Sequence, residues 1–116
     1  MFLNLNHTKL EVFKTSRALV LNCYKVTKQF PDEEKFGIIS QIRRAGLSIH
    51  LNIAEGASRR SKTERQRYFE IARGSVIEVD TAFDIALALN YCNESGLQVT
   101  GILIVDTFKM LTGLMK

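Results

Sequence analysis

The segment from Ile38 to Ile53 carries an apolar stripe that constrains the fold more than any other feature. Its members recur at steps of three and four residues, which gather on one side of an α-helix that turns by about 100° per residue. The single proline, Pro31, lies outside the segment, and a chain with one such helix breaker favours a few long helices over many short strands. The stripe consists of Ile38, Ile39, Ile42, Ala45, Gly46, Ile49 and Ile53.

Residues that stop or start helices divide the chain into four helical segments. Pro31 ends the first, because the residue before a proline avoids the α region. Gly56 is expected to cap the second, and Ser61 with Glu64 forms a capping-box pattern at the start of the third. A turn at residues 93–96 separates the third from the fourth. The predicted helices run over residues of about 9–29, 33–55, 62–90 and 98–115.

The other three segments have apolar stripes of their own. Short turns between long helices place neighbours antiparallel, and 116 residues suffice for one domain. The sequence therefore predicts an all-α protein, an antiparallel up-down-up-down four-helix bundle over residues 1–116. Its expected core adds Leu10, Phe13, Val20, Cys23, Thr27 and Phe30 from the first helix; Phe69, Ala72, Val76, Val79, Phe83, Ala86 and Asn90 from the third; and Ile104, Phe108, Leu111 and Met115 from the fourth.

The second and third helices also carry apolar residues opposite their core stripes. A bundle helix in a monomer needs one apolar stripe, and monomers rarely leave a second, extended one in water. The second stripe predicts a homo-oligomer; the alternative is that these residues are scattered on the surface or covered by loops. The expected interface residues are Phe36, Leu47, Leu51, Ile71, Ala82, Ile85 and Leu89.

Four polar residues, Arg44, Ser48, Glu55 and Glu78, interrupt this second stripe. They are expected to form a buried hydrogen-bonded network that fixes the register of the helices. The alternatives are a metal or small-molecule site that includes Arg44, Glu55 and Glu78, and simple exposure to solvent.

Catalytic and metal-binding patterns are missing from the sequence. Neither His7 nor His50 follows a glutamate at the spacing of a di-metal bundle site, and no phosphate-binding loop, dinucleotide fingerprint or zinc spacing occurs. His7 is expected to be exposed and His50 to lie on the flank of the second helix. Cys23 and Cys92 are expected to be buried free thiols. We expect a protein that is not an enzyme and has no cofactor and no metal.

A cluster of positive charge is the strongest functional signal, in a chain of net charge +4 and pI near 9.3. Cations at a helix start add to the positive end of the helix dipole, which is unfavourable, and a broken local rule often marks function. With Arg43 and Arg73, the cluster could hold several phosphates of RNA or DNA. The alternative is a solvated turn whose arginines pair with Glu55, Glu64 and Glu70. The cluster consists of Arg59, Arg60, Lys62, Arg65 and Arg67.

A second functional hypothesis is a protein–protein interaction scaffold that docks a partner through its second apolar stripe or the rim of the bundle. The first six residues lack the features of a signal peptide, and no segment is expected to cross a membrane. Free thiols suit a reducing compartment, so a cytoplasmic protein is expected.

The second helix carries two stretches of a specific pattern, Gln41-Ile42-Arg43-Arg44-Ala45-Gly46-Leu47-Ser48-Ile49 and Asn52-Ile53-Ala54-Glu55-Gly56. Through these stretches the chain resembles a bacterial family of four-helix bundles. These proteins are encoded in intervening sequences of large-subunit ribosomal RNA genes and are often labelled ribosomal-protein-like. The resemblance extends from about Leu10 to Leu114 and implies a homopentamer. The family is also similar to accessory proteins of diversity-generating retroelements, which are pentameric, basic bundles that bind nucleic acid and a reverse transcriptase.

The resemblance is supported outside the second helix and departs from the family pattern at two positions. Gly46 stands where the family usually has alanine, and Asp80 where it often has glutamate. Both residues are tolerable within a packed helix. The further matching positions are Phe30-Pro31, Glu34-Lys35-Phe36-Gly37, Arg59-Arg60-Ser61, Ile71-Ala72, Gly74-Ser75 and Glu78.

Overall fold

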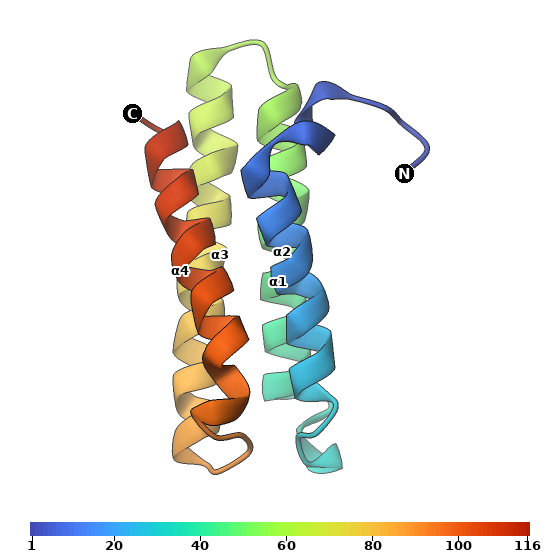
Figure 1. Ribbon diagram of the computed structural model, residues 1–116, viewed down its shortest axis with the longest axis vertical. Coiled ribbons are helices and arrows are strands. Elements are labelled where there is room, and N and C mark those ends of the chain that lie inside the picture. Colours follow the sequence, from blue (N-terminus) through green and yellow to red (C-terminus); the bar gives the residue numbers. More distant parts are fainter.

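Four α-helices alternate in direction along the long axis of the molecule (Figure 1), which confirms the predicted all-α bundle. The computed structural model describes residues 1–116. Three short 3-10 helices lie at the connections and before the first α-helix. The elements are η1 (Asn6–Lys9), α1 (Glu11–Thr27), η2 (Asp32–Glu34), α2 (Ile38–Ser58), α3 (Lys62–Ala88), η3 (Ser95–Leu97) and α4 (Gln98–Leu114).

The helices stand at the corners of a square. Helix α1 packs against α2 and α4, and α3 packs against the same two helices. The bundle therefore has four outer sides, each formed by two neighbouring helices. The side formed by α2 and α3 and the side formed by α3 and α4 share a helix and are adjacent.

Helix α2 begins and ends later than predicted. The acidic residues after Pro31 form η2, and Gly37 has a non-helical backbone (φ −105°, ψ −117°), so α2 starts only at Ile38. Gly56 does not cap the helix: it is buried within α2, which continues to Ser58. A Cβ atom at Gly56 would lie 2.8 Å from Cε1 of Phe69. The prediction of a C-cap was wrong because this glycine serves a close approach between α2 and α3.

Helix α3 begins where the sequence predicts and ends two residues earlier. The Ser61 hydroxyl accepts a hydrogen bond from the backbone N–H of Glu64 at 3.3 Å, which confirms the N-cap. At the other end Asn90 adopts a positive φ of 63°. Its N–H donates to the carbonyl of Leu87, and the N–H of Tyr91 donates to that of Ala86, each at 3.0 Å. This is a Schellman turn, so Asn90 terminates the helix and is not a core residue as predicted.

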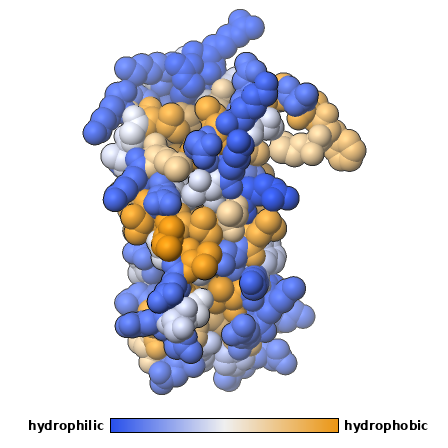
Figure 2. Space-filling view, in the orientation of Figure 1, coloured by the Kyte–Doolittle hydropathy of each residue, from blue (hydrophilic) through white to orange (hydrophobic).

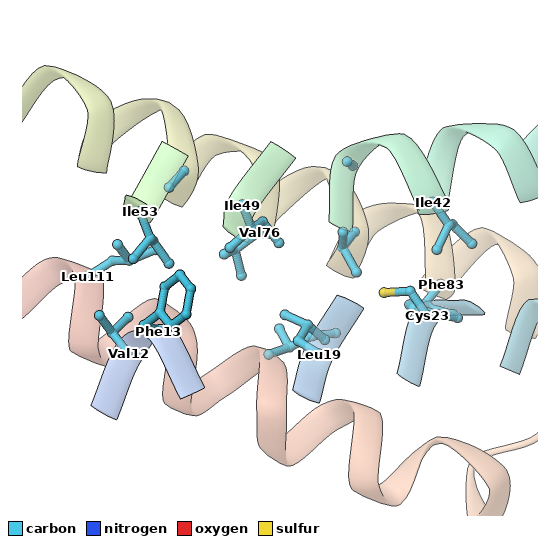
Figure 3. Packing of buried hydrophobic residues seen from close by; sticks show 14 of the residues in the cluster. Val12, Phe13, Leu19, Cys23, Ile42, Ile49, Ile53, Val76, Phe83 and Leu111 are labelled. Carbon is cyan, nitrogen blue, oxygen red and sulfur yellow. The ribbon is translucent and has the colours of Figure 1, made fainter. Parts of the chain in front are cut away.

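The core lies along the bundle axis, where side chains from all four helices meet (Figure 3). Ile42, Ile49 and Ile53 of α2 are fully buried, as their stripe predicts. The predicted stripes hold with two exceptions, the exposed residues Leu10 and Asn90. Val12 and Leu19 of α1 are buried although the predicted stripe omits them.

One helical segment, Ser95–Leu114, is long and apolar enough to cross a membrane by length and composition alone, and an 18-residue window within it has a mean hydropathy of 1.3. Only 28% of this window is buried in the bundle. Core helices of soluble proteins meet the same criteria of length and composition, so this is weak evidence for a span.

Candidate nucleic-acid interface

The turn between α2 and α3 is fixed by two of the predicted arginines. Arg59 follows α2 in an extended conformation, and its Nη2 donates to Oε2 of Glu55 at 2.9 Å. From the first turns of α3, Nη1 of Arg65 donates to the carbonyl oxygens of Arg59 at 3.0 Å and of Arg60 at 2.6 Å. Arg65 therefore satisfies backbone acceptors in the turn, where they would otherwise need water.

The ring of Tyr68 organises two further cationic groups. The guanidinium groups of Arg59 and Arg67 lie 5.1 Å and 5.2 Å from its centroid. Nη2 of Arg59 also donates to the Tyr68 hydroxyl at 3.2 Å. Tyr68 first, and then Glu55 and Glu64, raise the pKa of the Arg59 guanidinium. The aromatic ring thus holds cations together without neutralising them.

Three members of the cluster remain available for an anion. Arg60 and Lys62 make no side-chain hydrogen bond or ion pair, and Arg67 makes only the contact with Tyr68. All three are exposed. The alternative of a fully paired turn holds only for Arg59, because the pair with Glu55 is the single ion pair of the structure.

The structure separates Arg43 from this cluster, whereas Arg73 faces α4. Nε of Arg43 donates to Oγ1 of Thr27 at 2.9 Å, next to the end of α1, which lies at the opposite end of the bundle. The guanidinium group of Arg73 lies over the ring of Phe108 at 5.7 Å, on the α4 side of α3. The expectation that Arg43 extends the cluster was wrong, because its side chain reaches the far end of α1. Arg73 lines one pocket with Gln66 and Lys116, near the start of α3 and the end of the chain.

Tertiary structure adds basic residues that sequence reasoning missed. The start of α1 lies at the same end of the bundle as the α2–α3 turn (Figure 1), since Ser16 and His50 are hydrogen-bonded. The end of α4 is also there, because Nε2 of Gln66 donates to the carbonyl of Met115 at 2.8 Å. We call the whole region the basic end. It combines the cluster with Lys9, Lys14, Arg17 and Lys116.

The opposite end of the bundle has a different character. Asp32, Glu33, Glu34 and Glu94 lie in its connections, among the lysines Lys25, Lys28 and Lys35. Positive charge is therefore concentrated at one end, and Figure 2 shows long hydrophilic side chains projecting from that end, at the top of the view. The sequence predicts that positive charge gathers at one end only once the directions of the helices are known.

The predicted interface residues lie on the outer side formed by α2 and α3. Leu47, Leu51, Ile71, Ile85 and Leu89 are all exposed in the single chain, between 40% and 54%. Phe36 lies before α2 and is 91% exposed. Ala82 is half-buried and packs against the core, so it contributes less to this surface than predicted.

The four polar residues of this side do not form a buried network within one chain. Arg44, Glu55 and Glu78 are exposed, and only Ser48 is half-buried. The hydroxyl of Ser75 donates to that of Ser48 at 3.0 Å, whereas Glu55 pairs with Arg59. The expectation was wrong for the single chain because these side chains point outward from the contact between α2 and α3.

A serine–histidine pair lies between α1 and α2, which sequence reasoning did not foresee. Nδ1 of His50 lies 2.7 Å from Oγ of Ser16, and the same hydroxyl donates to the carbonyl of Phe13 at 3.0 Å. Its only proton is thereby used, so it accepts a hydrogen bond from Nδ1–H. Ser16 is fully buried, and the rings of Phe13 and His50 are stacked at 4.2 Å. We interpret this pair as a structural contact.

The remaining cysteine and histidine side chains do not form a binding site. Burial raises the pKa of the Cys23 thiol to about 12, which confirms a buried free thiol, whereas Cys92 is half-buried. His7 is half-buried, with its ring edge against Phe13. No group of three or more His, Cys, Asp or Glu residues is arranged to hold a metal ion.

Comparisons with known proteins agree with the resemblance in the sequence. The model of a family described as 23S rRNA-intervening sequence protein matches residues 8–113. A crystal structure of a protein with unknown function, from the S23 ribosomal protein family of Bacteroides thetaiotaomicron, is similar with a TM-score of 0.79 and 21% sequence identity. The similarity covers 90% of this chain and 98% of that chain, and at this identity it shows the fold alone. No curated protein matches. Because the family model covers nearly the whole chain, the protein belongs to the 23S rRNA-intervening sequence protein family.

Proposed function

We propose that this protein is a homo-oligomeric, non-enzymatic module that binds the phosphate backbone of RNA or DNA through its basic end. The observation that carries the proposal is the set of three exposed and unpaired cations, Arg60, Lys62 and Arg67, beside two arginines that fix the turn. Such groups position a protein on a nucleic acid without reading its sequence.

The geometry of the turn supports backbone recognition. Arg59 and Arg65 are held by Glu55, Tyr68 and carbonyl oxygens, so the turn keeps its shape without a ligand. Its free cations lie next to the N-terminus of α3, whose unpaired N–H groups favour anions. A phosphate here would therefore contact both exposed, unpaired cations and the fixed backbone of the turn.

Oligomerisation would multiply a weak contact. The exposed apolar residues of the α2/α3 side support assembly, and the family resemblance implies a pentamer. When several basic ends engage one nucleic acid, the effective concentration at the later ends rises and the total affinity exceeds that of one end.

The proposal is tested by measuring binding of a structured RNA and a DNA duplex at increasing salt. The variant R60A/K62A/R67A should bind at least tenfold more weakly, and the slope of log K against log salt should fall by about two to three units, at about 0.7–0.9 units per lost phosphate contact. A matched control is K25A/K28A/K35A, which removes the same charge from exposed lysines at the opposite end.

Equal losses in the two triple variants would show that net charge, and not the basic end, governs binding. Binding that is indifferent to salt would reject the proposal. Both variants change exposed residues, so circular dichroism should show unchanged helix content in each.

A protein-interaction scaffold remains the second candidate, favoured by the exposed apolar residues. It predicts specific co-purification with a protein and no retention on heparin. Retention on heparin that the triple variant R60A/K62A/R67A abolishes would favour nucleic-acid binding over this alternative.

A further inference from the structure

The segment before η1 forms an arm that carries apolar side chains into solvent. We call residues 1–4 the arm. In Figure 1 it extends away from the helices at the end of the bundle where the α2–α3 turn lies, and Figure 2 shows it as a hydrophobic extension beside hydrophilic side chains. Met1, Phe2 and Leu3 are 83%, 107% and 66% exposed. The arm therefore adds nothing to the core and is free to contact another molecule.

The root of the arm is fixed, so its position relative to the basic end is defined. The Thr8 hydroxyl donates to the carbonyl of Leu5 at 2.8 Å, and η1 packs against α1 and α2. The ring edge of His7 lies against Phe13, with the ring centroids 5.0 Å apart. Three residues of extended chain span at most about 11 Å, which limits the distance between Phe2 and Leu5. The ring of Phe2 therefore stays at the basic end.

Phe2 differs in its surroundings from Phe36, the other phenylalanine that is more than nine-tenths exposed. The remaining phenylalanines are buried or half-buried. Phe36 lies at the opposite end, just after the acidic residues of η2, and the ammonium group of Lys35 lies 5.6 Å from its ring centroid. The ring of Phe2 is fully exposed at the basic end, so both of its faces are free.

The helix that follows the arm adds positive charge next to it. Lys9 ends η1, and Lys14 and Arg17 are exposed in the first turns of α1. Glu11 is the one acid among them. A polyanion bound at this end would therefore be attracted to the base of the arm as well as to the arginine turn.

The arm and the arginine turn are close enough to contact one short strand. The Phe13 ring that η1 contacts lies 4.2 Å from the ring of His50, which places the root of the arm beside this part of α2. From His50 to the end of α2 at Ser58 the helix rises about 12 Å, at about 1.5 Å per residue. At about 3.4 Å per nucleotide of a stacked strand, about four nucleotides span this distance.

We propose that Phe2 stacks on an unpaired base of a single-stranded nucleic acid whose phosphates are bound by the basic end. This inference rests on the proposed function and names its substrate class, because single strands should bind in preference to duplexes. Proteins hold single strands by combining a cationic surface that follows the backbone with aromatic rings on which bases stack. In a duplex the bases are stacked on one another, so the ring gains a partner only after base steps are unstacked at a cost.

The preference is tested by measuring binding of a single-stranded oligonucleotide of about 12 nucleotides, as RNA and as DNA, and of the duplex of the same sequence. Phe2→Ala should weaken binding of the single strand by about fivefold or more, which corresponds to the loss of one base stack, and binding of the duplex by less than about twofold. Phe2→Trp should bind the single strand at least as tightly as the wild-type chain, because its ring is larger.

Two further variants separate stacking from a merely apolar contact. Phe2→Leu keeps an apolar side chain but no ring face, and it should lose most of the affinity that Phe2→Ala loses. Leu3→Ala removes exposed apolar surface from the same arm and should weaken binding by less than about twofold. Both positions are exposed, so neither change affects the core. Full affinity in Phe2→Leu, or equal losses for single strand and duplex in Phe2→Ala, would overturn the proposal.

Fluorescence gives a second readout, because the chain contains no tryptophan. In Phe2→Trp the emission of the single indole should be quenched when the single-stranded oligonucleotide binds, whereas the indole of Phe36→Trp, at the opposite end, should not respond. Unchanged emission of Phe2→Trp at saturation would overturn the proposal. Emission that changes with protein concentration alone would show that the arm docks on a second copy of the chain, which would also overturn it.

The salt dependence distinguishes failure of this inference from failure of the proposed function. Phe2→Ala removes no charge, so its slope of log K against log salt should equal that of the wild-type chain, whereas R60A/K62A/R67A lowers the slope. Wild-type affinity of Phe2→Ala for the single strand, with weakened binding by the triple variant, would disprove stacking and leave phosphate binding standing. Binding of the wild-type chain that is indifferent to salt would remove both.

Discussion

The α2/α3 pair and α4 bury their residues in different ways. In α2, Gly46 and Gly56 are buried against Cys23 and Phe69, so neighbouring helices approach closely at both positions. In α4, added Cβ atoms at Gly101 and Gly113 would meet nothing within 4 Å. The closely packed pair determines the shape of the bundle, whereas α4 completes the core and leaves apolar surface outside. Substitutions in α2 and in α4 are therefore expected to change the free energy of unfolding by different amounts.

The largest contrast is expected between two isoleucines. Ile49→Ala removes a fully buried side chain of α2 and should lower the free energy of unfolding by about 2–5 kcal/mol. Ile102→Ala on α4 should change it by no more than about 0.5 kcal/mol, because its side chain is exposed in one chain. Urea titrations of dilute protein measure both values. Equal losses of stability in the two variants would contradict the contrast between α2 and α4.

Glycine substitutions are expected to act in opposite directions. Gly56→Ala places a methyl group 2.8 Å from the Phe69 ring and should cost about 1–3 kcal/mol of unfolding free energy. Gly101→Ala meets open space within a helix and should stabilise by about 0.5–1 kcal/mol. The measurement is the midpoint of thermal unfolding for each variant. A neutral Gly56→Ala would show that α2 and α3 can separate without cost.

The starts of α3 and α4 sharpen the comparison further. Ser61 caps α3 through its side chain, whereas α4 has no side-chain cap. Ser61→Ala should therefore cost about 1 kcal/mol. Thr63→Ala, an exposed change in the first turn of the same helix, is the control and should stay within about 0.5 kcal/mol. Equal effects would mean that the hydroxyl of Ser61 contributes nothing as a cap.

The smallest change in stability is expected from pH, through the contact between α1 and α2. Burial first, and then the charges of Arg17 and His7, lower the pKa of His50 below its ordinary value of 6.5. The unfolded chain therefore binds more protons near that pH, so stability is complete above pH 6.5 and declines as the pH falls. Urea midpoints at pH 7.5 and 5.5 measure the decline, and His50→Gln should reduce it. An unchanged decline in His50→Gln would assign it to other groups.

Sequence reasoning recovered much of the fold because local rules and packing agree along α2 and α3. The isoleucines of α2 and the cap at Ser61 are where their spacing predicts. It failed at Gly56 and Asn90, where glycine can mean a cap or a close contact and asparagine can extend a stripe or end a helix. For Gly56 the close contact with Phe69 decides between a cap and a packing role. For Asn90 the hydrogen bonds of the Schellman turn decide between a core residue and a helix end.

The candidate site was predicted in part for a similar reason. A dense run of arginines can be recognised without a structure, so the cluster at the turn was predicted from the sequence. The split into two arginines that brace the turn and three free cations depends on hydrogen bonds to Glu55 and to backbone oxygens. The placement of Arg43 was wrong because the helix against which a side chain packs is known only once the neighbouring helices are placed.

By itself the sequence determined the number of helices, the residues that face the core and the location of the densest positive charge. These properties follow from spacing along a single chain, because a helix converts separations of three and four residues into faces. The tertiary structure decided which ends of distant helices meet, and so joined Lys9, Lys14 and Lys116 to the arginine turn. It also decided which apolar residues remain outside, because burial depends on the position of neighbouring helices in space.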